Sequence, residues 1–187
     1  MNTIIRHANV NDVPAMAALI NEHAERGAML HRSHQELYDQ LRDFQVACAD
    51  DRLIGVCGLR IMWANLAEVY ALAIDSSIQR SGFGRALVLA AVEDARTLGI
   101  STVFTLTYVP TFFERCKFAV ANRSDLPLKV WSECFRCPKR ECCDEVAMIR
   151  GITDVPEITE TKPAPDPQQF EVIVPTVSVR KPSNDAK

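Results

Sequence analysis

The chain lacks a long apolar run, an excess of basic residues and an internal repeat. No apolar stretch approaches the roughly 20 residues of a membrane-spanning helix, so we expect no membrane partner. The 24 Asp and Glu residues outnumber the 21 Lys and Arg, and the net charge is -3. Proteins that act on nucleic acid usually carry a basic excess, so no nucleic-acid partner is expected either. A local basic site for a small anion remains compatible with this charge.

The N-terminal segment also lacks a positively charged start followed by an apolar stretch. That pattern marks a secretory signal peptide, so we expect a cytoplasmic protein. Its seven cysteines should then be reduced or bound to a metal, because disulfides rarely persist in that compartment. The 187 residues, 48% of them hydrophobic, suit one domain with a substantial core.

Apolar periodicity, helix caps and polar turns predict the order of the secondary structure. Helices are expected at about 11–25, 33–41, 82–98 and 110–116, and strands at 3–8, 44–49, 53–63, 66–74, 101–108, 118–121, 128–131 and, as an edge strand, 146–150. The three consecutive strands should be antiparallel, and the strand–helix–strand step at 66–108 should be parallel. The predicted fold is α/β (α+β), with a mixed, mostly antiparallel central sheet flanked by helices.

The composition changes after Gly151, because six of the ten prolines follow it. We predict a domain over 1–151, with a Cys-rich segment at 132–145, and a Pro-rich C-terminal extension over 152–187. Residues 170–179 in the extension are apolar and β-branched. They would form either an arm on the domain surface or a strand added to a partner's sheet edge.

The segment Gln79-Arg80-Ser81-Gly82-Phe83-Gly84 separates a predicted strand from a predicted helix. A helix N-terminus presents unpaired N–H groups and a partial positive charge, which favour an anion. The two glycines let the backbone approach a phosphate closely, and Arg80 and Arg85 add positive charge. The alternative is a simple tight turn. Neither a Walker loop nor a dinucleotide fingerprint fits, because the Gly-Lys-Ser/Thr and the third Gly are both missing.

This segment resembles the acetyl-CoA motif of the GNAT acetyltransferase superfamily, Gln/Arg-x-x-Gly-x-Gly/Ala after an apolar strand. The resemblance covers roughly residues 3–118 and implies acetyl-CoA as the co-substrate. It also implies that the backbone N–H groups of 80–85 hold the pyrophosphate. Leu72, Ala73 and Ile74 would pair with the pantetheine amides, with N–H near Ala73 polarising the thioester. One departure is Ser76, where proline is common.

Two side chains are candidates for the proton transfers of such a reaction. Glu68 is the one acidic side chain in the apolar strand 66–74, which suits a general base. Its alternative role is a structural carboxylate paired with Arg or Lys. Many GNAT members carry the acid, a Tyr, in a Phe-Tyr-Glu-Lys-like stretch, but residues 112–115 read Phe-Phe-Glu-Arg. Tyr108 is therefore the candidate acid, or else a packed aromatic.

Further segments resemble the acetyltransferase domain of N-acetylglutamate synthases, and in particular the short bacterial forms without a kinase-like domain. They are 27–33, 44–46, 66–69, 106–108 and 126–131. The resemblance implies L-glutamate as the acceptor and a role in arginine biosynthesis. Arg32 and Lys129 are the cations in these segments that can hold its two carboxylates. The alternatives are an exposed arginine near a helix start and a solvated strand lysine.

Two other functions remain open at this point. The domain could acetylate another small amine, or it could bind CoA without catalysis as a sensor, because the fold does not fix the function. The missing helix tyrosine favours the second. A homodimer is compatible with the sequence but is not indicated by any motif.

Four cysteines lie within ten residues, as Cys134-x2-Cys137-x4-Cys142-Cys143. Cys-x2-Cys is a good half-site for zinc, but adjacent cysteines chelate one ion poorly. Three interpretations stay open: a zinc site, a redox-sensing group, or reduced thiols that pack a loop. The last is the one we favour, so no metal is assigned.

Overall fold

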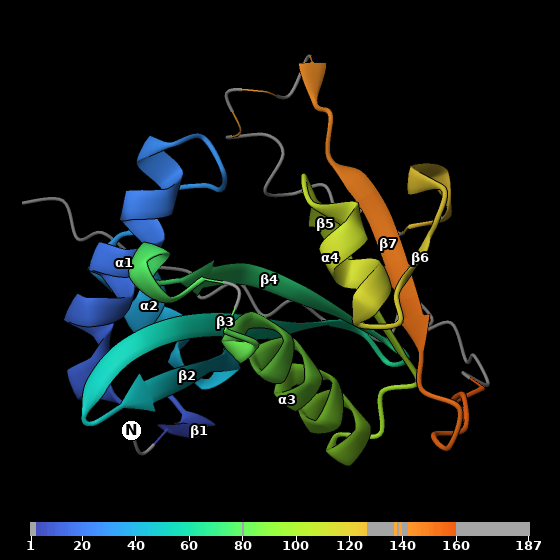
Figure 1. Ribbon diagram of the computed structural model, residues 1–187. Helices are drawn as coiled ribbons and strands as arrows, with labels where there is room; N and C mark the ends of the chain where they lie inside the picture. The colour runs from blue at the N-terminus through green and yellow to red at the C-terminus, as the bar shows by residue number, and fades with distance from the viewer. Residues whose placement is uncertain (1–2, 80, 127–136, 138, 140–141, 160–187) are drawn as a thin grey trace, which may run out of the picture.

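The computed structural model describes residues 3–79, 81–126, 137, 139 and 142–159 (Figure 1). Seven strands form one sheet in the order β1-β2-β3-β4-β5-β7-β6. All neighbouring strands are antiparallel except β4 and β5, which are parallel. The mixed, mostly antiparallel sheet expected from the sequence is therefore confirmed.

The elements follow the expected order. The strands are β1 (Thr3–His7), β2 (Phe44–Ala49), β3 (Arg52–Trp63), β4 (Leu66–Ile74), β5 (Thr102–Thr107), β6 (Ala119–Val120) and β7 (Val146–Gly151). The α-helices are α1 (Val13–Glu25), α2 (His34–Asp39), α3 (Phe83–Thr97) and α4 (Pro110–Arg115). Short 3-10 helices lie at Val10–Asp12, Leu41–Asp43, Ser76–Ile78 and Arg123–Asp125.

Two helix boundaries lie where the sequence predicted them, because each is formed by a local capping motif. The expected capping box at α2 is present, because Ser33 Oγ accepts from the Glu36 N–H and the Glu36 carboxylate accepts from the Ser33 N–H. Gly27 follows α1 with φ +70°, the left-handed conformation that glycine adopts easily. The α2 helix ends at Asp39, two residues earlier than expected, and a 3-10 turn takes over.

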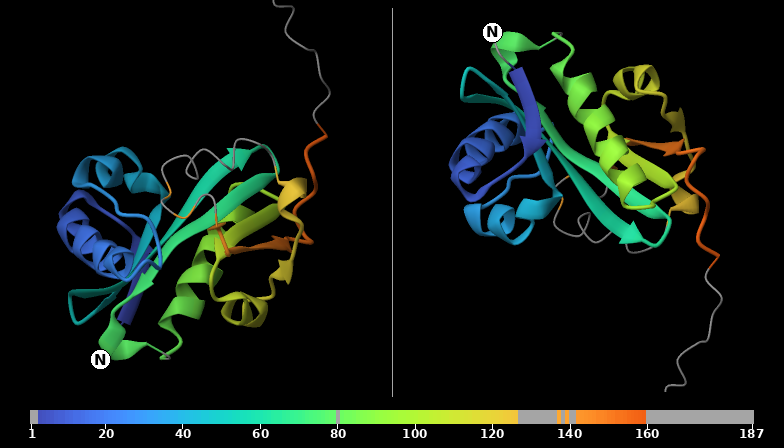
Figure 2. Two further views of the ribbon diagram at one scale, coloured as in Figure 1. Left: turned by 90° about the horizontal axis from the view of Figure 1, so that it is seen from above. Right: turned by 90° about the horizontal axis from the view of Figure 1, so that it is seen from below.

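Helices cover both faces of the sheet (Figure 2). Side chains alternate along β2, so Val46 and Cys48 pack with α1 and α2, while Ala47 and Ala49 pack with α3. This alternation places the two layers of core on opposite sides of β2, β3 and β4. The strand β4 is consequently buried on both faces, as its unbroken apolar sequence predicted.

The prediction of an edge strand at 146–150 is wrong. The strand β7 lies inside the sheet, between β5 and β6, and pairs with β5 along six residues. The sheet edge on this side is β6, which pairs with β7 through two residues only. The expected strand at 128–131 and the apolar stretch at 170–179 lie outside the described residues.

Residues 152–159 run along the domain. Ile152 is buried in the core beside α3, and its N–H donates to the Ser101 carbonyl at 2.7 Å. The Ile158 N–H donates to Asn65 Oδ1, also at 2.7 Å. The domain boundary at 151 stays a prediction. In the described parts of the chain, no helix has both the length and the apolar character needed to cross a membrane.

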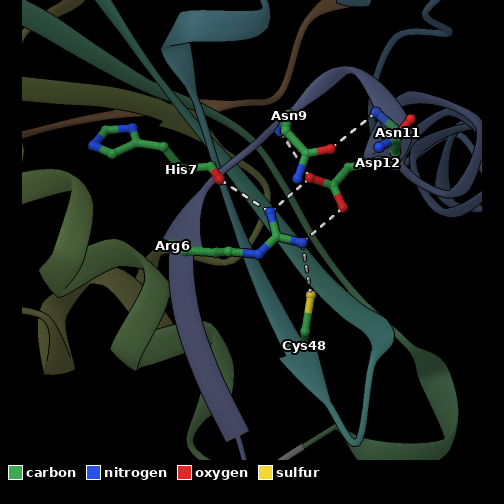
Figure 3. A network of polar contacts seen from close by, with 6 residues as sticks. All are labelled: Arg6, His7, Asn9, Asn11, Asp12 and Cys48. Atoms are coloured by element: carbon green, nitrogen blue, oxygen red, sulfur yellow. Dashed lines mark hydrogen bonds and ion pairs between the residues drawn. The ribbon is translucent and has the colours of Figure 1, made fainter.

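A polar network fastens β1 to the segment that precedes α1 (Figure 3). The Arg6 guanidinium donates to both carboxylate oxygens of Asp12, at 2.7 and 2.9 Å. The same carboxylate accepts from the Asn9 N–H at 2.7 Å, and Arg6 also reaches Cys48 Sγ at 3.7 Å. The hydrogen bond from Arg6 is the main cause that lowers the pKa of Asp12. The network thus fixes the start of α1 against the sheet.

Replacing Arg6 with Met should lower the free energy of unfolding at pH 7 by about 1 kcal/mol, since the lost pair is partly exposed and screened. The pKa of Asp12 is lowered on folding. The stabilisation from the Arg6–Asp12 pair is therefore present at neutral pH, and it is lost as the pH falls through the folded-state pKa of Asp12. Urea unfolding at pH 7 and at about pH 3 measures this. Arg26→Met, which breaks an exposed pair with Glu22 on α1, is the control and should show little change. An equal loss for Arg6→Met at both pH values would contradict the assignment.

Candidate active site

The strands β4 and β5 separate after a short parallel contact, and this divergence creates the site. They pair only at three positions, from Leu66 opposite Thr102 to Glu68 opposite Phe104. Beyond Glu68 they run apart, as Figure 1 shows. The register between β3 and β4 shifts in the same region, and Ala71 has φ +49°. A bulge with this strained residue bends β4 away from β5.

A cavity of about 1490 Å³ fills the space between the diverging strands. Its walls come from the end of α1, the loop after it, β4, the end of β5, α4 and the segment before β7. Among the described residues its lining carries five Arg or Lys side chains and two Glu: Arg32, Arg60, Arg115, Arg123, Lys139, Glu68 and Glu145. The chain is acidic as a whole, but this cavity is basic and suits an anionic ligand.

The expected anion loop opens directly into this cavity. Gly82 caps α3 with φ +91°, and a Cβ added there would meet nothing within 4 Å. Gln79 and Gly84 line the cavity, whereas Ser81, Phe83 and Arg85 flank them without lining it. The first N–H groups of an α-helix have no partner within their own helix, so the start of α3 stays a predicted anion site. Arg80 lies outside the described residues.

The strand β4 borders the cavity with residues 68–72 and Ile74. Leu72 and Ile74 are half-buried and line it, while Ala73 is buried, faces α1 and pairs with Val56 of β3. His23 of α1 bonds through Nε2 to the Ile74 carbonyl at 2.9 Å. The three residues expected to meet pantetheine therefore do not present equivalent side chains to the cavity, although they share one exposed strand edge.

Glu68 is nearly buried and lines the cavity. Arg60 of β3 lies directly across the strand pair and donates to Glu68 Oε2 at 3.0 Å. The side chains of this pair are only 20% and 12% exposed, so solvent screens it weakly. A guanidinium at this distance favours the ionised carboxylate. The expected pairing of Glu68 with an arginine is thus present, and its role as a base stays a prediction.

Tyr108 follows β5 and lines the opposite wall of the cavity. Burial, and then the negative charge of Glu145, raise the pKa of Tyr108 to about 12. Lys139 Nζ lies 4.5 Å from the centre of its ring. The phenol is protonated at neutral pH, as a general acid must be, and its raised pKa makes it a weaker acid than a free tyrosine.

Arg32 is 5% exposed, so the interpretation as an exposed residue near a helix start is wrong. Asn21 of α1 clamps its backbone, accepting from the Arg32 N–H at 2.9 Å and donating to its carbonyl at 3.0 Å. The guanidinium lies 5.3 Å from the centre of the Tyr70 ring and lines the cavity. Arg32 and Glu68 are brought to one site from segments that are far apart in the sequence.

The profile of the Acetyltransferase (GNAT) family matches residues 15–118, which include the anion loop, β4 and β5. This chain belongs to the acetyltransferase (GNAT) family.

An uncharacterised N-acetyltransferase of Chlorobaculum tepidum is 34% identical to this acetyltransferase over 81% of this chain and 97% of its own. The amino-acid acetyltransferase of Mycobacterium tuberculosis is 29% identical over 71% of this chain and 78% of its own. Among solved structures, the N-acetylglutamate synthase of Neisseria gonorrhoeae, complexed with coenzyme A and N-acetyl-glutamate, superposes with a TM-score of 0.73 at 29% identity. That match covers 81% of this chain but only 35% of the synthase.

The cysteine-rich segment of this acetyltransferase reaches the cavity. Cys137, Cys142 and Cys143 line it, and Arg123 lies 3.4 Å from Cys143 Sγ. Within the described residues, no group of three or more His, Cys, Asp or Glu is placed to hold a metal ion. Cys134 and the expected acceptor cation Lys129 both lie outside those residues.

Several residues of the site were missed from the sequence. Lys139 bridges the two walls, since its Nζ also donates to the Gly27 carbonyl at 3.1 Å. Arg60 and Tyr70 contact each other and flank Glu68. The signal for Arg60 was present, because it is the one basic residue in the interior of an otherwise apolar strand. For Lys139 no sequence signal distinguished it from other surface lysines.

Replacing Gly82 with Ala should destabilise the acetyltransferase by about 1 kcal/mol, because a left-handed φ strains any residue with a Cβ. Gly151→Ala is the matched control, since a Cβ there also meets nothing within 4 Å but its φ is not in that region. Because neither added Cβ is crowded, the difference between the two variants in urea unfolding measures the backbone strain at residue 82. Equal stability of both would show that the loop tolerates the left-handed residue.

Proposed function

We propose that this acetyltransferase transfers the acetyl group of acetyl-CoA to the α-amine of L-glutamate. The observation that carries the proposal is a basic cavity that is lined by both the buried Arg32 and the nearly buried Glu68. The similarity to amino-acid acetyltransferases and to an N-acetylglutamate synthase supports the acceptor. A role in arginine biosynthesis would follow from that product.

The residues of the site fit acetyl-CoA. The N–H groups at the start of α3 would hold the pyrophosphate, with Gly82 open to solvent and the Gly84 backbone at the cavity wall. The edge of β4 at Leu72–Ile74, which β5 does not pair with, would pair with the pantetheine arm as a neighbouring strand does, beside the Ile74 carbonyl that His23 contacts. Bound there, acetyl-CoA supplies an acetyl thioester that an amine can attack.

Glu68, Arg32 and Tyr108 would each serve a different step of the transfer. An amino acid arrives with a protonated amine, and Glu68, held ionised, would remove that proton directly or through water. Arg32 would hold an acceptor carboxylate by paired hydrogen bonds. Tyr108, protonated at neutral pH, would donate to the departing thiolate from the opposite wall. Lys129 remains a proposed second cation for the acceptor.

The acceptor is tested by incubating the full chain with acetyl-CoA and each of the proteinogenic amino acids, and by following release of free thiol. We expect release that depends on glutamate and is weaker with aspartate and glutamine, which change the length or the charge of one carboxylate. Isothermal titration with CoA confirms in parallel that the protein is folded and binds. CoA binding without glutamate-dependent release would remove the synthase assignment, and release with a different amine would name the true acceptor.

Two substitutions should give opposite kinetic signatures with glutamate. Glu68→Gln should lower kcat by about a hundredfold or more with little change in the KM for glutamate, because a general base acts in the chemical step. Arg32→Met should mainly raise the KM for glutamate, by roughly tenfold or more, because a charged hydrogen bond to the acceptor is lost. Arg26→Met, an exposed change at the end of α1, should alter neither. Unchanged kcat in Glu68→Gln would exclude Glu68 as the base.

A further inference from the structure

Six side chains from four segments form one polar cluster around the Tyr70 ring. Arg60 lies 4.4 Å and Arg32 5.3 Å from the ring centre. The Tyr70 hydroxyl lies 3.1 Å from Asp43 Oδ2 and 3.3 Å from Gln40 Oε1. Gln40 Oε1 also accepts from the Arg32 guanidinium at 3.3 Å. Glu68 joins the cluster through Arg60.

The Tyr70 ring occupies space that is open because the residue opposite it on β3 is a glycine. Gly58 of β3 lies directly opposite Tyr70, and a Cβ added to it would come within 2.4 Å of the ring. The ring therefore lies over the β3 backbone, and it is 8% exposed. Its contact with Phe44, at 5.3 Å between ring centres, fixes it from the side. The ring is a rigid surface on which both guanidiniums rest.

Glu68 needs Arg60 for a physical reason. A nearly buried carboxylate without a partner favours its neutral form, which cannot accept a proton. The Arg60 guanidinium lies 3.0 Å away and is largely shielded from solvent, and a positive charge so placed stabilises the charged form of a carboxylate. Among the described residues, the other charged or titratable groups that contact the cluster or line the cavity beside it include Arg32 before α2, Asp43 in the 3-10 turn, Tyr70 itself and Tyr108 across the cavity. Arg60 lies directly across the strand pair from the Glu68 carboxylate and donates to it.

We propose that Arg60 and Tyr70 are positioning residues of the acetyl transfer: Tyr70 holds the Arg60 guanidinium against its ring, and Arg60 holds Glu68 as an ionised carboxylate facing the cavity. This inference rests on the proposed role of Glu68 as the base. It adds that the base is tuned by Arg60 of β3, and that the acceptor cation Arg32 lies against the same Tyr70 ring.

The protonation of Glu68 can be measured without any turnover. Carbon-13 NMR follows the Glu carboxyl signals against pH, and the Glu68 signal is assigned by its loss in Glu68→Gln. In Arg60→Met and Arg60→Gln, the titration midpoint of Glu68 should rise by about one pH unit or more, because the neighbouring charge is gone. Arg60→Lys should restore part of the difference, since a lysine keeps the charge but not the planar contact with Tyr70.

Arg96→Met is the matched control, because Arg96 pairs with Glu93 and Asp154 on the surface, away from the cavity. It should leave the Glu68 midpoint where it is in the native chain. The neutral glutamine in Arg60→Gln can still donate to Glu68, so this variant keeps the fold if Arg60→Met does not. An unchanged midpoint in the neutral Arg60 variants would overturn the proposal.

Tyr70 is tested by two variants with the same readout. Tyr70→Phe keeps the ring and should leave the Glu68 midpoint nearly unchanged, whereas Tyr70→Leu removes the support of Arg60 and should raise it. Equal Glu68 midpoints in Tyr70→Phe and Tyr70→Leu would overturn the role of Tyr70.

The pH profile of turnover completes the test: its acidic limb should move to higher pH in Arg60→Gln. If the NMR midpoint moves but no amine is acetylated by the native chain, the proposed function fails, and only the effect of Arg60 on the Glu68 carboxylate stands.

Discussion

The site depends on one constraint, which is that β4 pairs with β3 along its length but with β5 over only three residues. A parallel pair that continued would have closed the space with backbone hydrogen bonds. The bulge near Ala71, whose φ of +49° is costly for a residue with a Cβ, bends β4 before this can happen. The cavity, the free edge of β4 and the open end of β5 all follow from that bend.

Electrostatics then give the cavity its character. The chain carries a net charge of -3, but among the described residues the lining of the cavity between the strands carries five Arg or Lys side chains and two Glu. Three of these cations make cation–π contacts: Arg32 and Arg60 with the ring of Tyr70, and Lys139 with the ring of Tyr108. Cations supported in this way keep their positions before a ligand arrives, which lowers the entropic cost of binding.

The family of the chain could be predicted from short motifs because those motifs are local. The loop at Gln79–Gly84 needs only a strand, two glycines and a helix start, and each of these leaves a mark in the sequence. The acceptor side was harder, because its residues come from distant segments. Arg32 was found through resemblance, yet its burial was not foreseen, since the Asn21 clamp and the Tyr70 ring belong to other elements.

The sequence by itself determined the elements, their order and the anion loop, because periodicity, caps and glycines act within a few residues. Tertiary structure decided which side chains meet. A regular two-residue turn, with Trp63 opposite Leu66, would place Arg60 opposite Val69. An irregularity between Ile61 and Trp63 shifts the register by one residue and brings Arg60 opposite Glu68. Such a shift costs little locally and is settled by packing on both faces of the sheet, so no motif predicts it. For the same reason β7 is an interior strand, since the partner of β5 is chosen by the whole sheet.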